Sequence, residues 1–308
     1  MKHFILISTL ASLIRGAGSS FAQTFLKGSK KYIHPFEKID DKTLSNHIDN
    51  IADSARIVGL GEVSHYTKEC YELKHQIIQT LIDKGFDALV LEVDFGQAVL
   101  WNDYVVHGKG NIDSLIAQSG WFTYRTQEFK NVLTSIRKHN TTAEKPFQVF
   151  GMEMTAMNYN LNWLANYLES KENAKILVDQ LKEERTIVAF QQHTREEVLS
   201  YWTLYFDLVN YLADNEAALI VEKGDHQYQI AQRMGEIMRQ YATYISQDEF
   251  FLKVELRDQF SSRNVLWCLD QLGEESKIAI WAHNGHVAKK SILLSLIHIS
   301  EPTRLSRI

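Results

Sequence analysis

The sequence predicts an α/β fold in which a central, mainly parallel sheet is flanked by helices and carries a large helical cap or insertion. Two patterns support this fold class. Short apolar runs alternate with segments of helical periodicity through the first half of the chain, as in a parallel sheet whose strands are connected by helices. A long helical stretch follows, and one more apolar run near the end returns the chain to the sheet.

Four apolar runs predict the strands of the sheet. They are residues 55–60, 87–93, 147–152 and 277–283. The segments between the first three runs have helical spacing, and one of them predicts a helix over residues 126–140. Strands joined by helices pair in parallel, so their carboxyl ends lie along one edge of the sheet.

Residues 158–271 form the predicted helical subdomain. This stretch contains almost no glycine or proline, and its apolar residues recur at helical spacing, as in "VLSYWTLYFDLVNYLAD". The chain has 308 residues, of which 45% are hydrophobic and only three are proline. That length and composition predict one globular unit, with the helices as a cap or insertion.

Both ends of the chain are expected to lie outside this unit, which then spans residues 23–293. Residues 1–22 combine a basic Lys2, an apolar run and small residues near Ala22, the pattern of a cleaved signal peptide. The run is too short to cross a bilayer, so we expect export to the periplasm or medium without stable membrane insertion after cleavage. Residues 294–308 resemble a translated sequencing adapter, so we expect the native protein to continue beyond Leu293.

The composition bears on partners and on redox state. The formal net charge is -5, and no cluster of lysines and arginines is interleaved with aromatic residues, so nucleic acid is not an expected partner. Cys70 and Cys268 lie far apart in the sequence, each beside apolar neighbours. Such cysteines are typical of buried free thiols, and we expect no disulfide between them.

Titratable side chains lie at the ends of three predicted strands. They are Glu62 and His65 after the first strand, Glu92 in the second, and His283 and His286 after the last. Because these strand ends share one edge of the sheet, we expect the five side chains to converge. A histidine flanked by carboxylates can activate water, and a second histidine can donate to an oxyanion. The chain has no Gly-x-Ser-x-Gly motif, which disfavours a serine hydrolase.

Four segments resemble the erythromycin esterase family in their order and spacing. They are "GLGEVSHYTKECYELKHQIIQTLIDKGFDALVLEVD", "GWFTYRTQEF", "RDQFSSRNVLWCLDQL" and "IAIWAHNGHVAK". Agreement of several separate elements is more specific than one short motif. The resemblance implies metal-independent hydrolysis of a macrolide lactone, a small-molecule substrate, with no cofactor. It also implies that His65 is the general base, that Glu62 and Glu92 are the acidic residues around it, and that His283 and His286 match the family's His-Asn-Gly-His element.

Five further residues are candidates for substrate binding. They are Lys74, Trp121, Tyr124, Arg125 and Glu153. Family members commonly carry an arginine where this chain has Lys74 and an aspartate where it has Glu153, so both positions depart from the resemblance. Trp121 and Tyr124 either line a groove for a bulky ligand or belong to the core. For Arg125 we expect a carboxylate partner, either Glu92 or Glu153.

Two other functions stay open on the residues alone. The same imidazoles and carboxylates are ligands that zinc or manganese accept, which would suit a metal-dependent hydrolase of another ester or amide. Glu-x-x-His by itself is a weak metal signal. The third interpretation is a non-catalytic binding protein with the same fold, although the titratable residues of the motif are all present in this chain.

Overall fold

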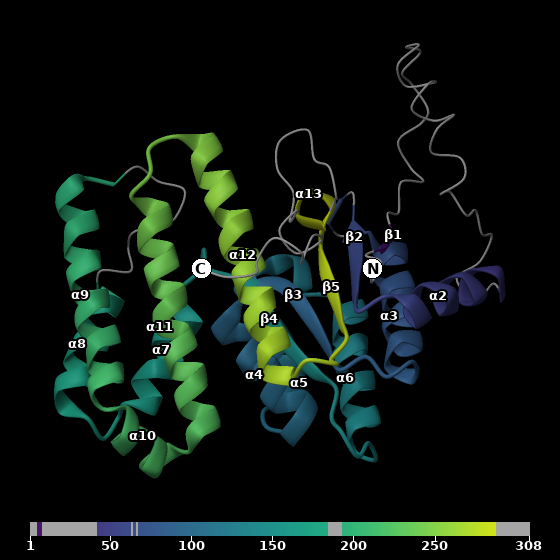
Figure 1. Cartoon of the computed structure of the whole chain (residues 1–308), viewed down its shortest axis with the longest axis horizontal. Coiled ribbons are helices and arrows are strands. Elements are labelled where there is room, and N and C mark those ends of the chain that lie inside the picture. Colours follow the sequence, from purple (N-terminus) through teal and green to yellow (C-terminus); the bar gives the residue numbers. More distant parts are fainter. Residues whose placement is uncertain (1–4, 8–41, 63, 66, 184–192, 288–308) are drawn as a thin grey trace.

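The computed structural model describes residues 5–7, 42–62, 64–65, 67–183 and 193–287 (Figure 1). Its centre is a five-stranded sheet with the order β1-β2-β5-β3-β4, in which the strand pairs run parallel. The α/β fold class predicted from the sequence is therefore confirmed. The expected adapter-like tail at residues 294–308, and the expected signal peptide apart from Ile5–Ile7, lie outside the described residues.

The strands follow the predicted apolar runs closely. Their bounds are Ile5–Ile7 (β1), Ile57–Glu62 (β2), Ala88–Asp94 (β3), Gln148–Glu153 (β4) and Ile278–His283 (β5). The last strand in the sequence, β5, lies between β2 and β3, so it brings the end of the described chain to the middle of the sheet. The short edge strand β1 was not predicted, because its residues belong to the run interpreted as a signal peptide.

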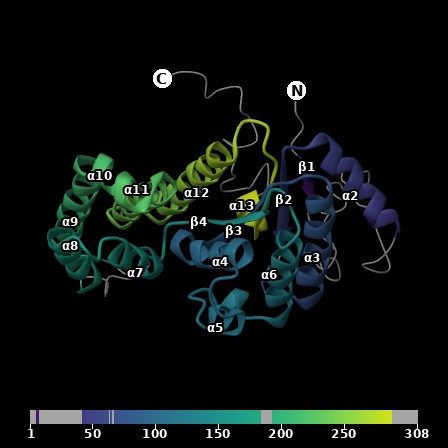
Figure 2. The same ribbon diagram turned by 90° about the horizontal axis from the view of Figure 1, so that it is seen from below.

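Helices cover both faces of the sheet. Their bounds are Lys42–Ser54 (α2), Lys68–Asp83 (α3), Phe95–His107 (α4), Ile112–Ala117 (α5), Phe122–Tyr124 (η2), Gln127–Asn140 (α6), Phe250–Leu272 (α12) and Asn284–Val287 (α13). Figure 2 shows α3, α4 and α6 on one side of the sheet and α12 on the other. Side chains along a strand alternate between these two faces. In β3, Leu89 and Leu91 pack with α3, α4 and α6, while Ala88 and Val90 pack with α12.

Helix α6 shows how the sequence specifies these elements. Its buried residues Phe129, Val132, Leu133 and Ile136 recur at helical spacing and form the stripe that packs in the sheet core. Each such side chain contributes about 1.5–3 kcal/mol when it is removed from water. The Thr126 side chain accepts a hydrogen bond from the backbone N–H of Phe129, which begins the helix at the predicted residue.

A second group of helices occupies the region for which the sequence predicts a helical subdomain. Their bounds are Asn158–Tyr167 (α7), Glu172–Glu183 (α8), Arg195–Asp214 (α9), Glu216–Lys223 (α10) and Asp225–Ile245 (α11). They have their own apolar core, to which α12 contributes Phe260. Further along α12, Val265 and Cys268 pack on the sheet instead. Helix α12 therefore connects the two cores, and its N-terminal half lies at the edge of the sheet where the strands end (Figure 1).

Cys70 and Cys268 are both free thiols, as predicted, but only Cys268 is fully buried and Cys70 is partly exposed. Burial raises the pKa of Cys268 to about 12, so this thiol is inert near neutral pH. Among the described helices, none is long and apolar enough to cross a membrane.

Candidate active site

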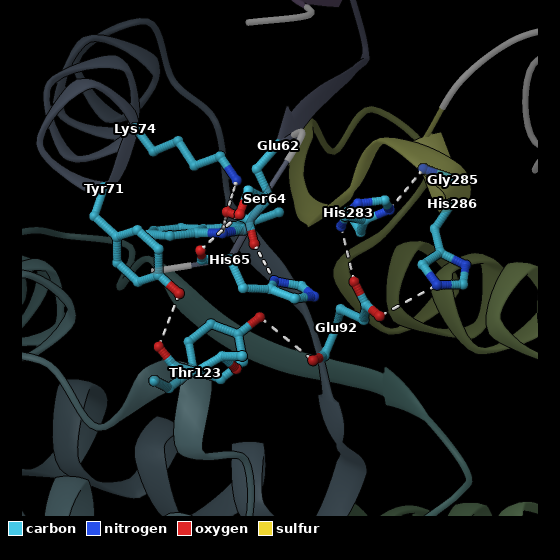
Figure 3. A network of polar contacts seen from close by, with 12 residues as sticks. Glu62, Ser64, His65, Tyr71, Lys74, Glu92, Thr123, His283, Gly285 and His286 are labelled. Atoms are coloured by element: carbon cyan, nitrogen blue, oxygen red, sulfur yellow. Dashed lines mark hydrogen bonds and ion pairs between the residues drawn. The ribbon is translucent and has the colours of Figure 1, made fainter. Parts of the chain in front are cut away.

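The candidate active site lies at the carboxyl ends of the central strands (Figure 3). Glu62 ends β2 and His283 ends β5, and the parallel register pairs these two residues. Glu92 lies on the neighbouring strand β3. Residues that are far apart in the sequence thus meet at one edge of the sheet, as predicted from the strand order.

Glu62 and His65 form a carboxylate–imidazole pair. Nδ1 of His65 lies 2.6 Å from Oε1 of Glu62. A carboxylate accepts hydrogen bonds but does not donate them, so Nδ1 carries the proton and Nε2 carries the lone pair. The hydrogen bond to Glu62 raises the pKa of His65 against the opposing effect of burial. This tautomer suits a general base that acts through Nε2.

Lys74 contacts the Glu62 side of this pair and is almost fully buried. Its Nζ donates to Oε2 of Glu62 over 2.7 Å, and the indole N–H of Trp281 donates to the same oxygen over 3.2 Å. Burial would raise the pKa of Glu62, but the hydrogen bond from His65 and the charge of Lys74 outweigh it and keep that pKa low. Burial lowers the pKa of Lys74 to about 8. Lys74 therefore orients Glu62, and its burial argues against direct contact with substrate.

The second imidazole, His283, faces the first. The ring centroids of His65 and His283 are 5.4 Å apart, with the rings tilted by 48°. Nδ1 of His283 accepts a hydrogen bond from the backbone N–H of Gly285 over 3.2 Å. In the neutral ring, the proton therefore sits on Nε2, the opposite arrangement to that of His65. One ring offers a lone pair and the other offers an N–H donor.

Glu92 is held by surrounding donors. Its Oε2 accepts a hydrogen bond from the backbone N–H of His283 over 2.8 Å, and its Oε1 accepts one from Arg257 over 2.8 Å. Burial would raise the pKa of Glu92, but the hydrogen bond and charge of His286 and the charge of Arg257 lower it well below the ordinary value. A carboxylate with this pKa stays ionised and is a poor proton acceptor.

Two residues of α12 complete the network, and neither was predicted as a site residue. Arg257 donates to both Glu92 and Glu153, and Oδ1 of Asp258 lies 2.7 Å from Nδ1 of His286. The other ring nitrogen of His286 lies 3.2 Å from Oε1 of Glu92. Arg257 and Asp258 belong to the segment "RDQFSSRNVLWCLDQL", whose resemblance to the family was noted without a role for either residue. The sequence signal that could have identified these two residues is an adjacent pair of opposite charges just before buried Phe260.

The predicted substrate-binding residues fall into two groups. Tyr124 is buried, Trp121 packs against the same core, and Glu153 is fully buried and paired with Arg257. Arg125 is exposed, and its Nε donates to the backbone carbonyl of Ser119 over 2.7 Å. The carboxylate partner expected for Arg125 is therefore wrong, because Arg257 from α12 occupies that position beside Glu92 and Glu153.

The metal-dependent alternative gains no geometric support. In the part of the chain that the structure describes, no group of three or more His, Cys, Asp or Glu side chains is arranged to hold a metal ion. The carboxylates proposed as ligands, Glu62 and Glu92, are each paired with a cationic side chain. A metal would have to displace those partners.

Known proteins resemble this chain in sequence and in fold. The family model of erythromycin esterase matches residues 82–294. Erythromycin esterase type II from Escherichia coli is 26% identical over 288 residues, which cover 85% of this chain and 67% of that protein. A solved structure from Bacillus cereus is 25% identical, has a TM-score of 0.70, and covers 92% of this chain and 72% of its own.

A further solved structure is similar in fold. It is a mutant of the erythromycin esterase EreC in its open conformation, with a TM-score of 0.58 and 18% identity over 84% of this chain and 69% of its own. The family model covers more than half of the chain and includes Glu92, Arg257, His283 and His286. The chain belongs to the erythromycin esterase family.

Proposed function

We propose that this protein opens the lactone ring of a macrolide by adding water, with His65 as the general base, and so inactivates the antibiotic. The observation that carries the proposal is the pair of imidazoles 5.4 Å apart, one with its lone pair and the other with its proton on Nε2. Family membership supports a hydrolase that acts on esters of small molecules. The macrolide is the substrate class suggested by the Escherichia coli relative's name.

The proposed reaction begins with water between the two rings. Nε2 of His65 takes a proton from the water as its oxygen bonds to the carbonyl carbon of the ester, and Glu62 stabilises the imidazolium that forms. The carbonyl oxygen becomes negatively charged and accepts a hydrogen bond from Nε2–H of His283. The bond from the carbonyl carbon to the lactone ring oxygen then breaks, and His65 returns the proton to that oxygen. The product is a linear hydroxy acid.

The test is mass spectrometry of erythromycin after incubation with the protein treated with chelator. We expect the macrolide to gain one water, and the His65→Ala variant to leave it unchanged. Activity that disappears on chelation and returns with added zinc or manganese would instead support the metal-dependent hydrolase. Absence of any gain, from a protein whose circular dichroism spectrum shows that it is folded, would contradict the macrolide as substrate.

We also propose that residues 1–22 direct export and are then removed. The basic start, apolar run and small residues before Gln23 support this. Cleavage would also remove β1, which pairs with Val58–Leu60 of β2. N-terminal sequencing of the protein recovered from the periplasm or medium should begin at Gln23, and recovery of an intact Met1 in the cytoplasm would contradict the proposal.

A further inference from the structure

A chain of contacts runs from α12 to the proposed oxyanion donor. Asp258 on α12 contacts Nδ1 of His286 on α13 at 2.7 Å, and Nε2 of His286 lies 3.2 Å from Oε1 of Glu92 on β3. The second oxygen of Glu92 accepts the backbone N–H of His283 on β5. Figure 3 shows Glu92 between His283 and His286. Four residues from four elements are thus connected in series.

We propose that Asp258 is a positioning residue that holds His286 as an imidazolium cation at neutral pH, and that this cation fixes Glu92 and, through it, the main chain of His283. The inference rests on the ester hydrolysis proposed above. It assigns different roles to the two histidines of "HNGH": His283 faces the reacting atoms, and His286 is a buried cation that neither accepts nor delivers the proton in the reaction.

The geometry requires the charged form of His286. Each of its ring nitrogens faces a carboxylate oxygen, Asp258 on one side and Glu92 on the other. A neutral imidazole has only one N–H, so one carboxylate oxygen would then face a nitrogen lone pair. Only the imidazolium donates to both. Both contacts are largely shielded from water, because the three side chains are each no more than 11% exposed.

The charges around His286 agree with this assignment. Burial lowers its pKa, but the hydrogen bonds from its ring to Asp258 and Glu92 outweigh burial and raise the pKa to about 9. Arg257 on α12 opposes the shift, and Arg257 is itself paired with Glu153 of β4. Two cations therefore share a buried cluster with the carboxylates of Glu92, Glu153 and Asp258. If His286 lost its proton, Arg257 would be the one cation of this cluster left to neutralise the three carboxylates.

The first test needs no substrate. The ring ¹H–¹³C signal of His286, identified by its loss in His286→Gln, is followed by NMR from pH 5 to pH 10.5 in the wild-type protein. We expect its midpoint near the pKa of about 9 given above. A midpoint at or below the ordinary value of 6.5 would overturn the proposal. Because no turnover is measured, this result stands whether or not macrolides are the substrate.

The second test uses Asp258→Asn, with the exposed Asp270→Asn on the same helix as the matched control. The variant keeps an oxygen acceptor but loses the negative charge that stabilises the imidazolium, so the NMR midpoint of His286 should fall by at least one pH unit. The ratio of variant to wild-type kcat should be near one at pH 6 and fall about fivefold by pH 9 for a shift of one pH unit, with KM little changed. A ratio that does not depend on pH would show a merely structural role. If the variant does not fold, the wild-type titration still decides.

Discussion

Glu62 is the carboxylate on which the proposed base depends. It accepts hydrogen bonds from His65, from buried Lys74 and from the indole of Trp281. These donors fix the orientation of the Glu62 carboxylate. The hydrogen bond to Glu62 in turn fixes the tautomer of the His65 ring. The half-buried imidazole of His65 is therefore positioned by a group of buried side chains.

His65→Ala should abolish most of the turnover without unfolding the protein. His65 is half-buried and its ring contacts lie at the surface of the site, so its loss costs little core packing. Removal of a general base lowers rates by about 10²–10⁴-fold. His107→Ala, at the exposed end of α4, is the matched control and should retain full kcat/KM. A His65→Ala enzyme with more than half of the wild-type rate would eliminate His65 as the base.

The acid limb of the pH–rate profile should respond to Lys74. The base must be unprotonated, and Glu62 raises the pKa of His65, so activity should rise with pH through a pKa above 6.5. The charge of Lys74 opposes this shift. In Lys74→Met the acid limb should therefore move to higher pH, while Lys74→Arg, which keeps the cation, should leave it in place. Superimposable pH–rate profiles for the two variants would show that the charge of Lys74 does not affect the pKa of His65.

The docking of α13 on β2 explains a glycine at the strand end. A Cβ built on Gly61 would lie 2.0 Å from Oδ1 of Asn284 and 3.1 Å from Val287, so any larger residue here forces the side chains of α13 to rearrange. Helix α13 carries His286, and Asn284 follows His283 directly. The missing side chain at Gly61 therefore leaves room for Asn284 and Val287, the residues that flank His286 in α13.

Gly61→Ala should displace α13 and lower kcat by at least about tenfold, since small misplacements of catalytic groups have effects of this size or larger. Gly235→Ala in α11 is the control, because its Cβ would meet side chains of α9, Val209 at 3.2 Å and Leu212 at 3.6 Å, in the helical subdomain and not at the site. Steady-state kinetics and thermal unfolding of both variants make the comparison. Unchanged kcat in Gly61→Ala would mean that α13 can shift without moving His283.

The junction between β3 and α7 contains a buried acid. Asp94 ends β3, is fully buried, and accepts a hydrogen bond from Asn160 of α7 over 2.8 Å. Burial raises the pKa of Asp94 well above its ordinary value of 3.8. The unfolded chain releases this proton more readily than the folded chain. The contribution of Asp94 to stability is therefore lost progressively as pH rises from about 4 toward the folded-state pKa.

Asp94→Asn should remove this pH dependence. Asparagine stays neutral, so the difference in unfolding free energy between variant and wild type should favour the variant increasingly with pH, by at most about 1.4 kcal/mol per pH unit. Urea unfolding of both proteins between pH 5 and pH 9 measures the difference. A difference that stays constant over this range would mean that Asp94 is ionised in the folded protein.

Helix α12 extends outward past the edge of the sheet where the site lies (Figure 1). Its first turn exposes Phe250 and Phe251, at 71% and 64%, seven and six residues before Arg257. Seven residues are about two helical turns, which places Phe250 on nearly the same face of the helix as Arg257. An exposed apolar side chain therefore lies about two turns from Arg257 on the same side of α12.

Phe250→Ala should change the choice among macrolides while leaving hydrolysis of a small ester unaffected. Loss of one exposed aromatic contact should raise KM for a bulky substrate by about 3–10-fold, corresponding to roughly 1 kcal/mol of apolar burial. Phe206→Ala, which removes a similarly exposed aromatic from α9, should change neither. Equal effects on bulky and small esters would show that the α12 tip does not contact the substrate.

The strand residues of the site could be predicted because their placement follows from a general rule. The period of the apolar runs located β2, β3, β4 and β5 to within two residues, and parallel pairing then brings Glu62, Glu92 and His283 to one edge. The family resemblance added which of these residues are expected to act in hydrolysis. Neither argument needed the position of any helix.

Arg257 and Asp258 could not be placed in this way. They follow Glu92 by more than 160 residues, and their proximity depends on how α12 rotates about its axis and where it crosses the sheet edge. Local periodicity does not determine either quantity. The same limit explains the wrong partner for Arg125, since the carboxylates it was expected to meet are occupied by an arginine from a distant helix.

By itself, the sequence determined the fold class, four of the five described strands, the free cysteines and the carboxylate and imidazole residues at the strand ends, because apolar period and strand direction are local properties. Only the tertiary structure decided the partners. It paired Glu62 with Lys74, placed Arg257 between Glu92 and Glu153, and set Asp258 against His286. Those pairings determine which groups stay charged, and charge in a buried site depends on neighbours that only packing brings together.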